Sequence, residues 1–165
     1  MRKEQLTIKT EKENIHACAF TGHRVLPSDF SASYLKEQII LLIERGAEVF
    51  YCGMAKGFDL LAGETVLALR EEYSHIRLIL CIPFYNQEKT FSAEDKKRYA
   101  EICKRADERI LISENYYKGC LLTRNRYMAD NADALIAYLE KDTGGTAYTV
   151  RYFQKTKPWG EIIFV

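Results

Sequence analysis

The chain has 165 residues, of which 47% are hydrophobic and 28% charged, proportions typical of a globular domain with one sizeable core. Its 24 Lys and Arg nearly balance its 23 Asp and Glu, so no global basic field favours nucleic acid or an anionic membrane as a partner. No apolar run approaches the ~18 residues that span a bilayer, and residues 1–14 lack the apolar centre of a secretory signal, so we expect a cytoplasmic protein.

Residues 1–14 are polar and predict an N-terminal extension or a short edge strand, followed by a single domain at 15–165. In that domain, short apolar runs alternate with segments of helical periodicity. Strands are expected at 15–20, 48–52, 77–82, 109–112, 134–139 and 161–165, and helices at 31–45, 57–73, 92–106, 119–131 and 146–156. This alternation predicts right-handed crossovers and a mainly parallel sheet, hence a Rossmann-like three-layer α/β/α fold.

The periodic segments also predict which side chains face the core. In the first helix, Leu35, Ile39, Leu42 and Ile43 recur at helical spacing, and in the last helix Ala147, Val150 and Phe153 are three residues apart. The five cysteines are odd in number and include no C-x-x-C pair, so neither a disulfide framework nor a metal site is indicated. Three of them, Cys18, Cys52 and Cys81, lie in apolar runs and are expected to be buried.

Ligands of parallel sheets bind beyond the carboxyl ends of the strands, so strand-to-helix turns are the places to search. Four such turns are 21-TGHR-24, 53-GMAKGFD-59, 83-PFYNQ-87 and 142-DTGGT-146. Three of the four carry glycine, which lets the backbone approach an anion closely. The N–H groups at the start of the following helices are unpaired donors in a positive dipole. These turns therefore predict a site for a nucleotide-like phosphate ligand.

Side chains near these turns could complete the site. Thr21 and Thr146 offer hydroxyl donors, and Arg24 and Arg124 offer positive charge. The base of a nucleotide would pack against the aromatic pair 84–85.

Polar residues in and near these turns could also have purely structural roles. Asp59 suits the first turn of a helix without any ligand, and Glu64 could be a solvated helix charge. His23 could be an ordinary loop histidine.

Four segments of the chain form a specific set: CAFTGHR at 18–24, YCGMAKGFDLLAGETVL at 51–67, CIPFYNQ at 81–87 and TRNRYMAD at 123–130. Over roughly residues 15–155, this set resembles the YpsA-like family of the SLOG superfamily, which also contains the LOG phosphoribohydrolases and the DNA-processing protein DprA. The resemblance implies a Rossmann-like fold and a pocket for nucleotides or nucleotide-derived ligands. It also implies that Glu64, Arg124 and Asn125 belong to the site with the glycine turns.

The last turn departs from the LOG pattern. LOG enzymes carry the pattern PGG-x-GT-x-x-E at this position, and its glutamate takes part in their catalysis. Here the stretch is 144-GGTAYTV-150, and Thr149 occupies the place of the glutamate. This departure favours binding over catalysis.

Three functions follow, in order. The first is a sensor or regulator that binds a nucleotide-like ligand, and the second is a LOG-like N-glycosidic hydrolase using Asp59, Glu64 or His23. The third is single-stranded DNA binding in the manner of DprA, which the near-zero net charge disfavours. The helix at 96–105 is basic, but its acidic residues favour the interpretation that it presents an ordinary solvated face. A homodimer is expected because such folds commonly pair through helices. The expected ligand-binding residues are Thr21, Gly22, His23, Arg24, Gly53, Met54, Ala55, Gly57, Asp59, Phe84, Arg124, Asn125, Gly144, Gly145 and Thr146.

Overall fold

The computed structural model of the chain describes residues 14–165, so the predicted N-terminal extension lies outside the described residues except for Asn14. Its strands are β1 (Ala17–Gly22), β2 (Val49–Cys52), β3 (Arg77–Ile82), β4 (Glu108–Leu111), β5 (Ala134–Tyr138) and β6 (Glu161–Phe164). Its helices are α1 (Ala32–Glu44), α2 (Phe58–Arg70), α3 (Ala93–Arg105), α4 (Cys120–Asp130) and α5 (Gly145–Thr156), with a short 3₁₀ helix, η2 (Gln87–Thr90).

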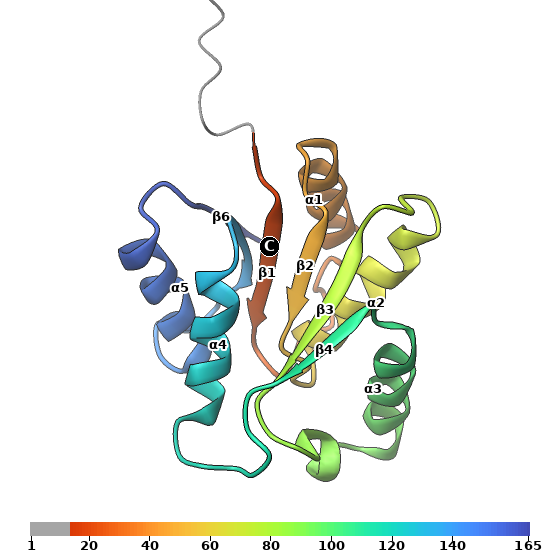
Figure 1. Cartoon of the computed structure of the whole chain (residues 1–165), viewed down its shortest axis with the longest axis vertical. Coiled ribbons are helices and arrows are strands. Elements are labelled where there is room, and N and C mark those ends of the chain that lie inside the picture. Colours follow the sequence, from red (N-terminus) through yellow and green to blue (C-terminus); the bar gives the residue numbers. More distant parts are fainter. Residues whose placement is uncertain (1–13) are drawn as a thin grey trace, which may run out of the picture.

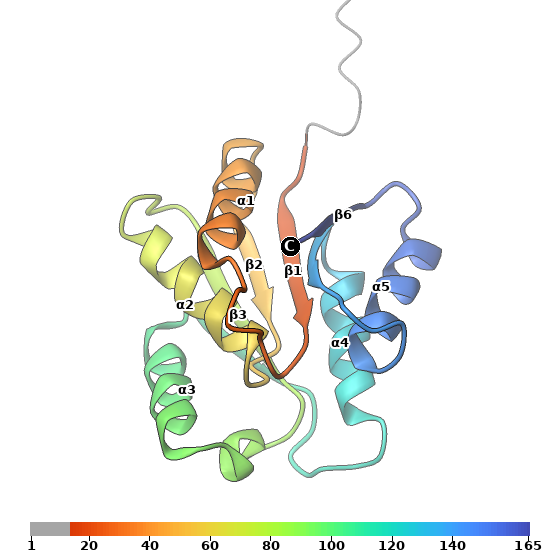
Figure 2. The same cartoon turned by 180° about the vertical axis from the view of Figure 1, so that it is seen from behind.

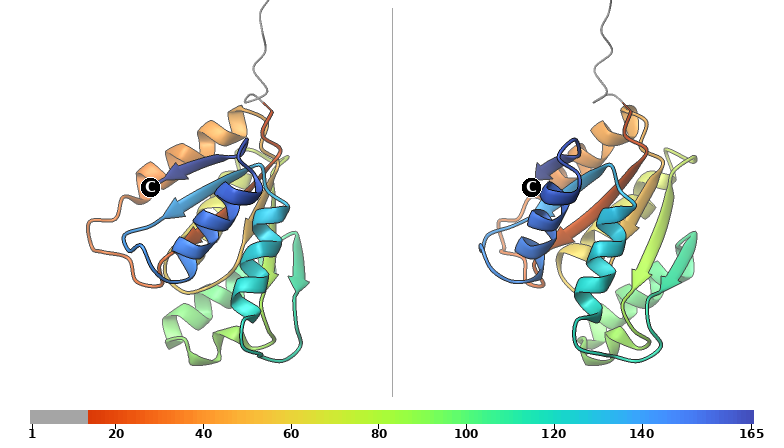
Figure 3. Two further views of the ribbon diagram at one scale, coloured as in Figure 1. Left: turned by 90° about the vertical axis from the view of Figure 1, so that its left-hand side faces the viewer. Right: turned by 60° about the vertical axis from the view of Figure 1, so that its left-hand side comes forward.

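The strands form one parallel sheet in the order β4-β3-β2-β1-β5-β6. The chain runs outward from β1 to β4 with α1, α2 and α3 on one face (Figure 1, and from behind in Figure 2). It then returns through α4 to β5 and through α5 to β6, so these two helices cover the other face, and the three layers are seen from the side in Figure 3. The strand order therefore reverses between β1 and β5. The predicted three-layer α/β/α fold is confirmed.

Burial follows the predicted pattern in most elements. The side chains Leu35, Ile39, Leu42 and Ile43 of α1 are buried, as are Ala147, Val150 and Phe153 of α5. All residues of β5 are buried, as expected for a central strand that is covered on both faces. Cys18, Cys52 and Cys81 are buried free thiols, as predicted.

Two differences from the predicted elements affect the candidate site. β1 extends to Gly22, two residues beyond the predicted strand, because Thr21 and Gly22 pair with Ala137 and Tyr138 of β5. In addition, η2 begins at Gln87, within a stretch for which no element was expected, and follows Asn86 in the left-handed conformation (φ 62°). Tertiary pairing, which local periodicity does not report, sets the extension of β1.

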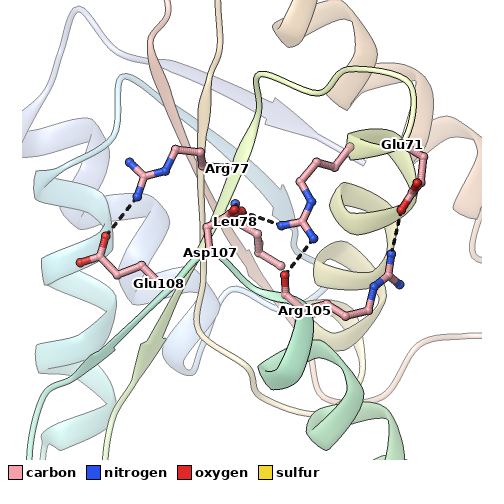
Figure 4. Close-up of polar contacts among 7 residues, drawn as sticks. Glu71, Arg77, Leu78, Arg105, Asp107 and Glu108 are labelled. Atoms are coloured by element: carbon pink, nitrogen blue, oxygen red, sulfur yellow. Dashed lines mark hydrogen bonds and ion pairs between the residues drawn. The ribbon is translucent and has the colours of Figure 1, made fainter.

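At the amino edge of the sheet, ion pairs join β3, β4, α2 and α3 (Figure 4). The Oδ2 atom of Asp107 accepts hydrogen bonds from the backbone N–H of Leu78 and from Nη1 of Arg70, each at 2.8 Å. Its neighbour Glu108 pairs with Arg77 at 3.5 Å, and both of these side chains are about half exposed. Asp107 therefore satisfies a backbone donor at the start of a buried strand, whereas Glu108 makes only a surface ion pair.

This contrast gives a matched test. We expect Asp107→Ala to lower the free energy of unfolding by about 1–2 kcal/mol, because it removes two charge-assisted hydrogen bonds. Glu108→Ala should change it by less than about 0.5 kcal/mol, since exposed ion pairs contribute little. Urea denaturation of both variants measures the difference, and equal destabilisation would contradict this role for Asp107.

Candidate functional site

A cavity of about 760 Å³ lies at the carboxyl ends of β1 and β5, where the strand order reverses. This is the crevice in which doubly wound sheets bind their ligands. Its walls come from the segments that follow β1, β2, β4 and β5. The lining residues are Phe20, Thr21, Gly22, His23, Arg24, Val25, Pro27, Ala55, Asp59, Tyr116, Gly119, Leu121, Leu122, Arg124, Asn125, Glu140, Lys141, Gly145 and Thr146.

The helices that begin at this cavity differ at their N-termini from those that do not. Ser31 caps α1 and Ser92 caps α3, each with a side-chain oxygen that accepts a backbone N–H. In contrast, α2, α4 and α5 follow Gly57, Gly119 and Gly144, and none of these three helices has a side-chain cap. The first-turn N–H groups of a helix without a side-chain cap are donors for an anion.

Asp59 is a buried carboxyl group on the cavity wall. Its Oδ2 atom accepts a hydrogen bond from the Ala55 N–H at 3.2 Å, whereas Oδ1 has no hydrogen-bond partner among the described residues. Burial raises the pKa of Asp59 to about 6, although Arg124 and the Ala55 N–H act in the opposite direction. Asp59 can therefore exchange a proton near neutral pH and hydrogen-bond to a ligand.

Arg124 reaches the same cavity from α4, on the other face of the sheet. It is 5% exposed, donates from Nη1 to the carbonyl of Gly53, and donates from Nε to Oδ1 of Asn125 at 2.7 Å. Burial lowers the pKa of Arg124. A Cβ atom at Gly53 would lie 2.8 Å from the guanidinium, so the absence of a side chain at this position lets Arg124 approach the end of β2.

The turns after β1 and β2 touch through their backbones. Gly57 has φ 78°, and a Cβ atom there would lie 2.3 Å from the carbonyl oxygen of Arg24. The Phe58 N–H donates to the carbonyl of His23 at 3.1 Å. Only glycine combines this conformation with this close approach, so Gly57 fixes the first turn against the start of α2.

His23 joins the turns after β1 and β5. Its Nε2 atom accepts a hydrogen bond from the Glu140 N–H at 2.8 Å, and its ring packs edge-on against Tyr138. This hydrogen bond links two residues of the cavity lining, His23 and Glu140. The contact indicates that His23 positions the cavity wall.

Several predicted site residues do not line the cavity. Gly53, Met54 and Gly57 support its wall, and Phe84 packs edge-on against Tyr116, 5.3 Å between ring centroids. Glu64 points toward α3 and pairs with Arg98, with Oε1 2.5 Å from Nε. Asp59 and Glu64 are five residues apart, a rotation of about 140° around the helix, so they cannot share one wall.

The turn between β4 and α4, together with the first turn of α4, contributes residues that we did not predict. Tyr116, Gly119, Leu121 and Leu122 all line the cavity, and the ring of Tyr116 is 65% exposed. Gly119, directly before a periodic apolar segment, was an available signal, because this turn also follows a strand. Five further lining residues were left outside the expected set: Phe20, Val25, Pro27, Glu140 and Lys141.

Within residues 14–165, no three His, Cys, Asp or Glu side chains gather in a way that could hold a metal ion. None of the helices in that range is long and apolar enough to cross a membrane.

Comparison with known proteins identifies the family. The model of the YspA SLOG family matches residues 29–159. The chain belongs to this family. A UPF0398 protein of Halalkalibacterium halodurans is 32% identical over 133 residues, which cover 79% of this chain and 70% of that protein. The SPbeta prophage-derived protein YoqJ of Bacillus subtilis is 30% identical over 139 residues, covering 74% of this chain and 81% of YoqJ.

Two solved structures share the fold of this chain. DNA processing protein A of Helicobacter pylori, which binds single-stranded DNA, aligns with a TM-score of 0.68 at 22% identity. DprA of Streptococcus pneumoniae aligns with a TM-score of 0.63 at 18% identity. Although 90% and 92% of this chain are covered, the chain spans only 64% and 50% of those two chains. At these identities the likeness concerns the fold.

The charge state of Asp59 gives a prediction for stability. The pKa of Asp59 is about 6 in the folded protein, and an aspartate in an unfolded chain has a pKa of about 4. The folded state is therefore penalised where the carboxylate is charged, and stability falls as the pH rises through this window. We expect Asp59→Asn to raise the free energy of unfolding near pH 7.5 by about 1–3 kcal/mol, and to have little effect near pH 4.

Urea denaturation across this pH range measures the effect. Glu64→Gln is the control, because it removes a carboxylate from the same helix but outside the cavity. Its effect on stability should show no such rise between pH 4 and 7.5. A loss of stability in Asp59→Asn at neutral pH would show that attraction to Arg124 outweighs the cost of burial.

Proposed function

We propose that the cavity binds a nucleotide-type ligand, a phosphate compound that also carries hydroxyl or amino groups, and that the protein acts as a sensor or regulator. The observation that carries the proposal is the combination of two chemistries in one cavity. One is the glycine-led start of α5, without a side-chain cap, and the other is the carboxyl group of Asp59 on the cavity wall, whose buried Oδ1 has no hydrogen-bond partner among the described residues. A simple anion would accept hydrogen bonds at the start of α5 but would offer no donor to Asp59.

The charges along the cavity suggest an orientation. Gly145 and Thr146 offer first-turn N–H groups, and the exposed Arg24 and Lys141 add positive charge at the same opening. The phosphate is therefore proposed to lie at α5. The hydroxyl or amino group would meet Asp59, because a carboxylate accepts from such donors and repels phosphate.

Tyr116 is the proposed contact for a base. It lines the cavity, and Phe84 supports its ring from outside the cavity. Aromatic faces stack with bases in a sequence-tolerant way. This assignment replaces the expected direct contact of Phe84 or Tyr85 with the base.

A LOG-like hydrolase is less well supported by these residues. Thr149 stands where LOG enzymes have glutamate, is 1% exposed, and donates from Oγ1 to the carbonyl of Gly145 at 2.8 Å. Among the described residues, the carboxyl groups that line the cavity are those of Asp59 and Glu140. Release of free base from nucleoside monophosphates that is lost in Asp59→Ala would assign the hydrolase instead.

Single-stranded nucleic acid is a second candidate ligand. The Helicobacter pylori protein with this fold binds single-stranded DNA, which weakens an exclusion based on net charge alone. Such binding would fall steeply with salt, because phosphate contacts release counterions. Binding of an unlabelled oligonucleotide that is insensitive to salt, or no binding at low salt, would count against this candidate.

Thermal unfolding with nucleoside monophosphates, NAD, ADP-ribose and cyclic dinucleotides tests the main proposal. A ligand at about 100 times its dissociation constant should stabilise the protein by about 2.7 kcal/mol. Arg24→Ala and Lys141→Ala should each weaken binding by about tenfold, because each removes a charge-assisted contact to phosphate. Lys155→Ala, an exposed cation at the other end of α5, is the control.

The proposal fails if no phosphate compound shifts the unfolding temperature of a normally folded protein. It also fails if Lys155→Ala weakens binding as much as Lys141→Ala does. Native mass spectrometry of the purified protein would reveal a co-purified phosphate compound. The same spectrum tests the expected homodimer, which stays a prediction.

A further inference from the structure

Helix α3 carries its positive charges on two different sides. Toward α2, its arginines are neutralised: Arg98 pairs with Glu64 and Asp95, and Arg105 pairs with Glu71. The carboxylates that pair with α3 therefore neutralise its arginines on the side that faces α2.

A groove of about 730 Å³ is lined by residues from η2, α3, the edge strand β4 and the residue before η2. Figure 1 shows α3 beside β4 at the margin of the sheet. Four cations line it, Lys89, Lys96, Lys104 and Arg109, with one acid, Glu88. No ion pair joins any of these four cations to a carboxylate within residues 14–165. Its other lining residues are Asn86, Tyr99, Ala100 and Cys103.

The spacing of these cations indicates the shape of a ligand. Lys96 and Lys104 are eight residues apart on α3, a distance of about 12 Å along the helix axis. Lys89 and Arg109 extend the positive charge onto η2 and β4. One phosphate group cannot reach both ends, so the groove fits a chain of phosphates in which successive charges meet successive cations.

Hydrogen bonds connect the inner wall of the groove to the end of β2. The Tyr99 hydroxyl, in a side chain 7% exposed, donates to Oε1 of Gln87 at 3.4 Å, and Nε2 of Gln87 donates to the Gly53 carbonyl at 3.2 Å. The same carbonyl accepts from Arg124 of the candidate ligand cavity. The groove and the cavity share no lining residue, so they are separate sites on either side of one hydrogen-bonded wall.

We propose that this groove is a second binding site, for a linear polyphosphate chain that Lys89, Lys96, Lys104 and Arg109 hold at the margin of the sheet. The chain could belong to a small polyphosphate or to the backbone of a single-stranded nucleic acid. Both present consecutive phosphates, and length dependence separates them. The proposal is independent of the ligand in the candidate cavity.

The test compares two double variants of equal charge in the full chain. Lys96→Glu/Lys104→Glu reverses charge in the groove, and Lys36→Glu/Lys97→Glu reverses the same charge at exposed positions outside it. Calorimetric titration with inorganic tripolyphosphate and with oligothymidylates of increasing length measures binding at low salt. We expect the groove variant to bind the better of these ligands about tenfold more weakly than the wild type, and the control variant to bind within about twofold of it.

The two ligands separate the sources of the phosphate chain. Tripolyphosphate binding that equals oligothymidylate binding assigns a small polyphosphate, and affinity that increases with oligothymidylate length assigns a nucleic-acid backbone. Equal loss in the two double variants, or no binding of either ligand, would overturn the proposal. Binding of an acidic peptide in preference to both ligands would also overturn it. Arg24→Ala alters the candidate cavity and leaves the groove intact. Binding that Arg24→Ala weakens and Lys96→Glu/Lys104→Glu leaves unchanged would belong to the cavity, so failure here and failure of the cavity ligand are distinguishable.

Discussion

The candidate site depends on a guanidinium that is buried where β2 ends. Arg124 comes from α4 on one face of the sheet, and its donors reach the Gly53 carbonyl, which leads into α2 on the opposite face. The contact therefore ties the two helical layers together across the carboxyl edge. It requires glycine at position 53, because a methyl group would occupy the space of the guanidinium. The geometry of the cavity wall follows from this contact.

Arg124 also makes the burial of Asp59 tolerable. An isolated buried carboxylate would be very costly, and an opposite charge offsets only part of that cost. The raised pKa of Asp59 and its unpartnered Oδ1 show that the compensation is incomplete. Incompletely satisfied polar groups concentrate at functional sites, where a ligand supplies the missing partner. The penalty at Asp59 is thus the physical reason for placing ligand chemistry at this wall.

Much of the scaffold was predictable because its signals are local. The strand 77–82 was predicted with the bounds of β3, since its apolar run ends at Pro83. The glycine turns were predictable too, because Gly57 and Gly144 adopt positive φ values that other residues rarely do. The extension of β1 to Gly22 was not predictable, because it depends on pairing with β5, a strand more than 100 residues away in the sequence.

Within the site, sequence identified the turns better than the side chains. Asp59 and Glu64 looked equivalent in the sequence, and only the helical rotation between them separates a cavity residue from the partner of Arg98. Tyr116 was not predicted as a cavity residue, because the turn after β4 carries no glycine until Gly119, three residues later. An aromatic residue in a loop has no periodicity that would reveal which way it faces. The direction of side chains in loops could therefore not be predicted from the sequence.

Net charge alone is a weak basis for excluding a class of partner, for a related reason. A formal charge of +1 averages over the whole chain, whereas ion pairing is decided between neighbouring side chains. Glu64 and Glu71 neutralise the arginines on one side of α3 and have no such effect on Lys96 and Lys104. Because salt screens charges beyond about 10 Å, a ligand in the groove responds to the local cations and not to the total. The fold is shared with DprA. Which ligands each surface of that fold attracts depends on the charges of the local side chains.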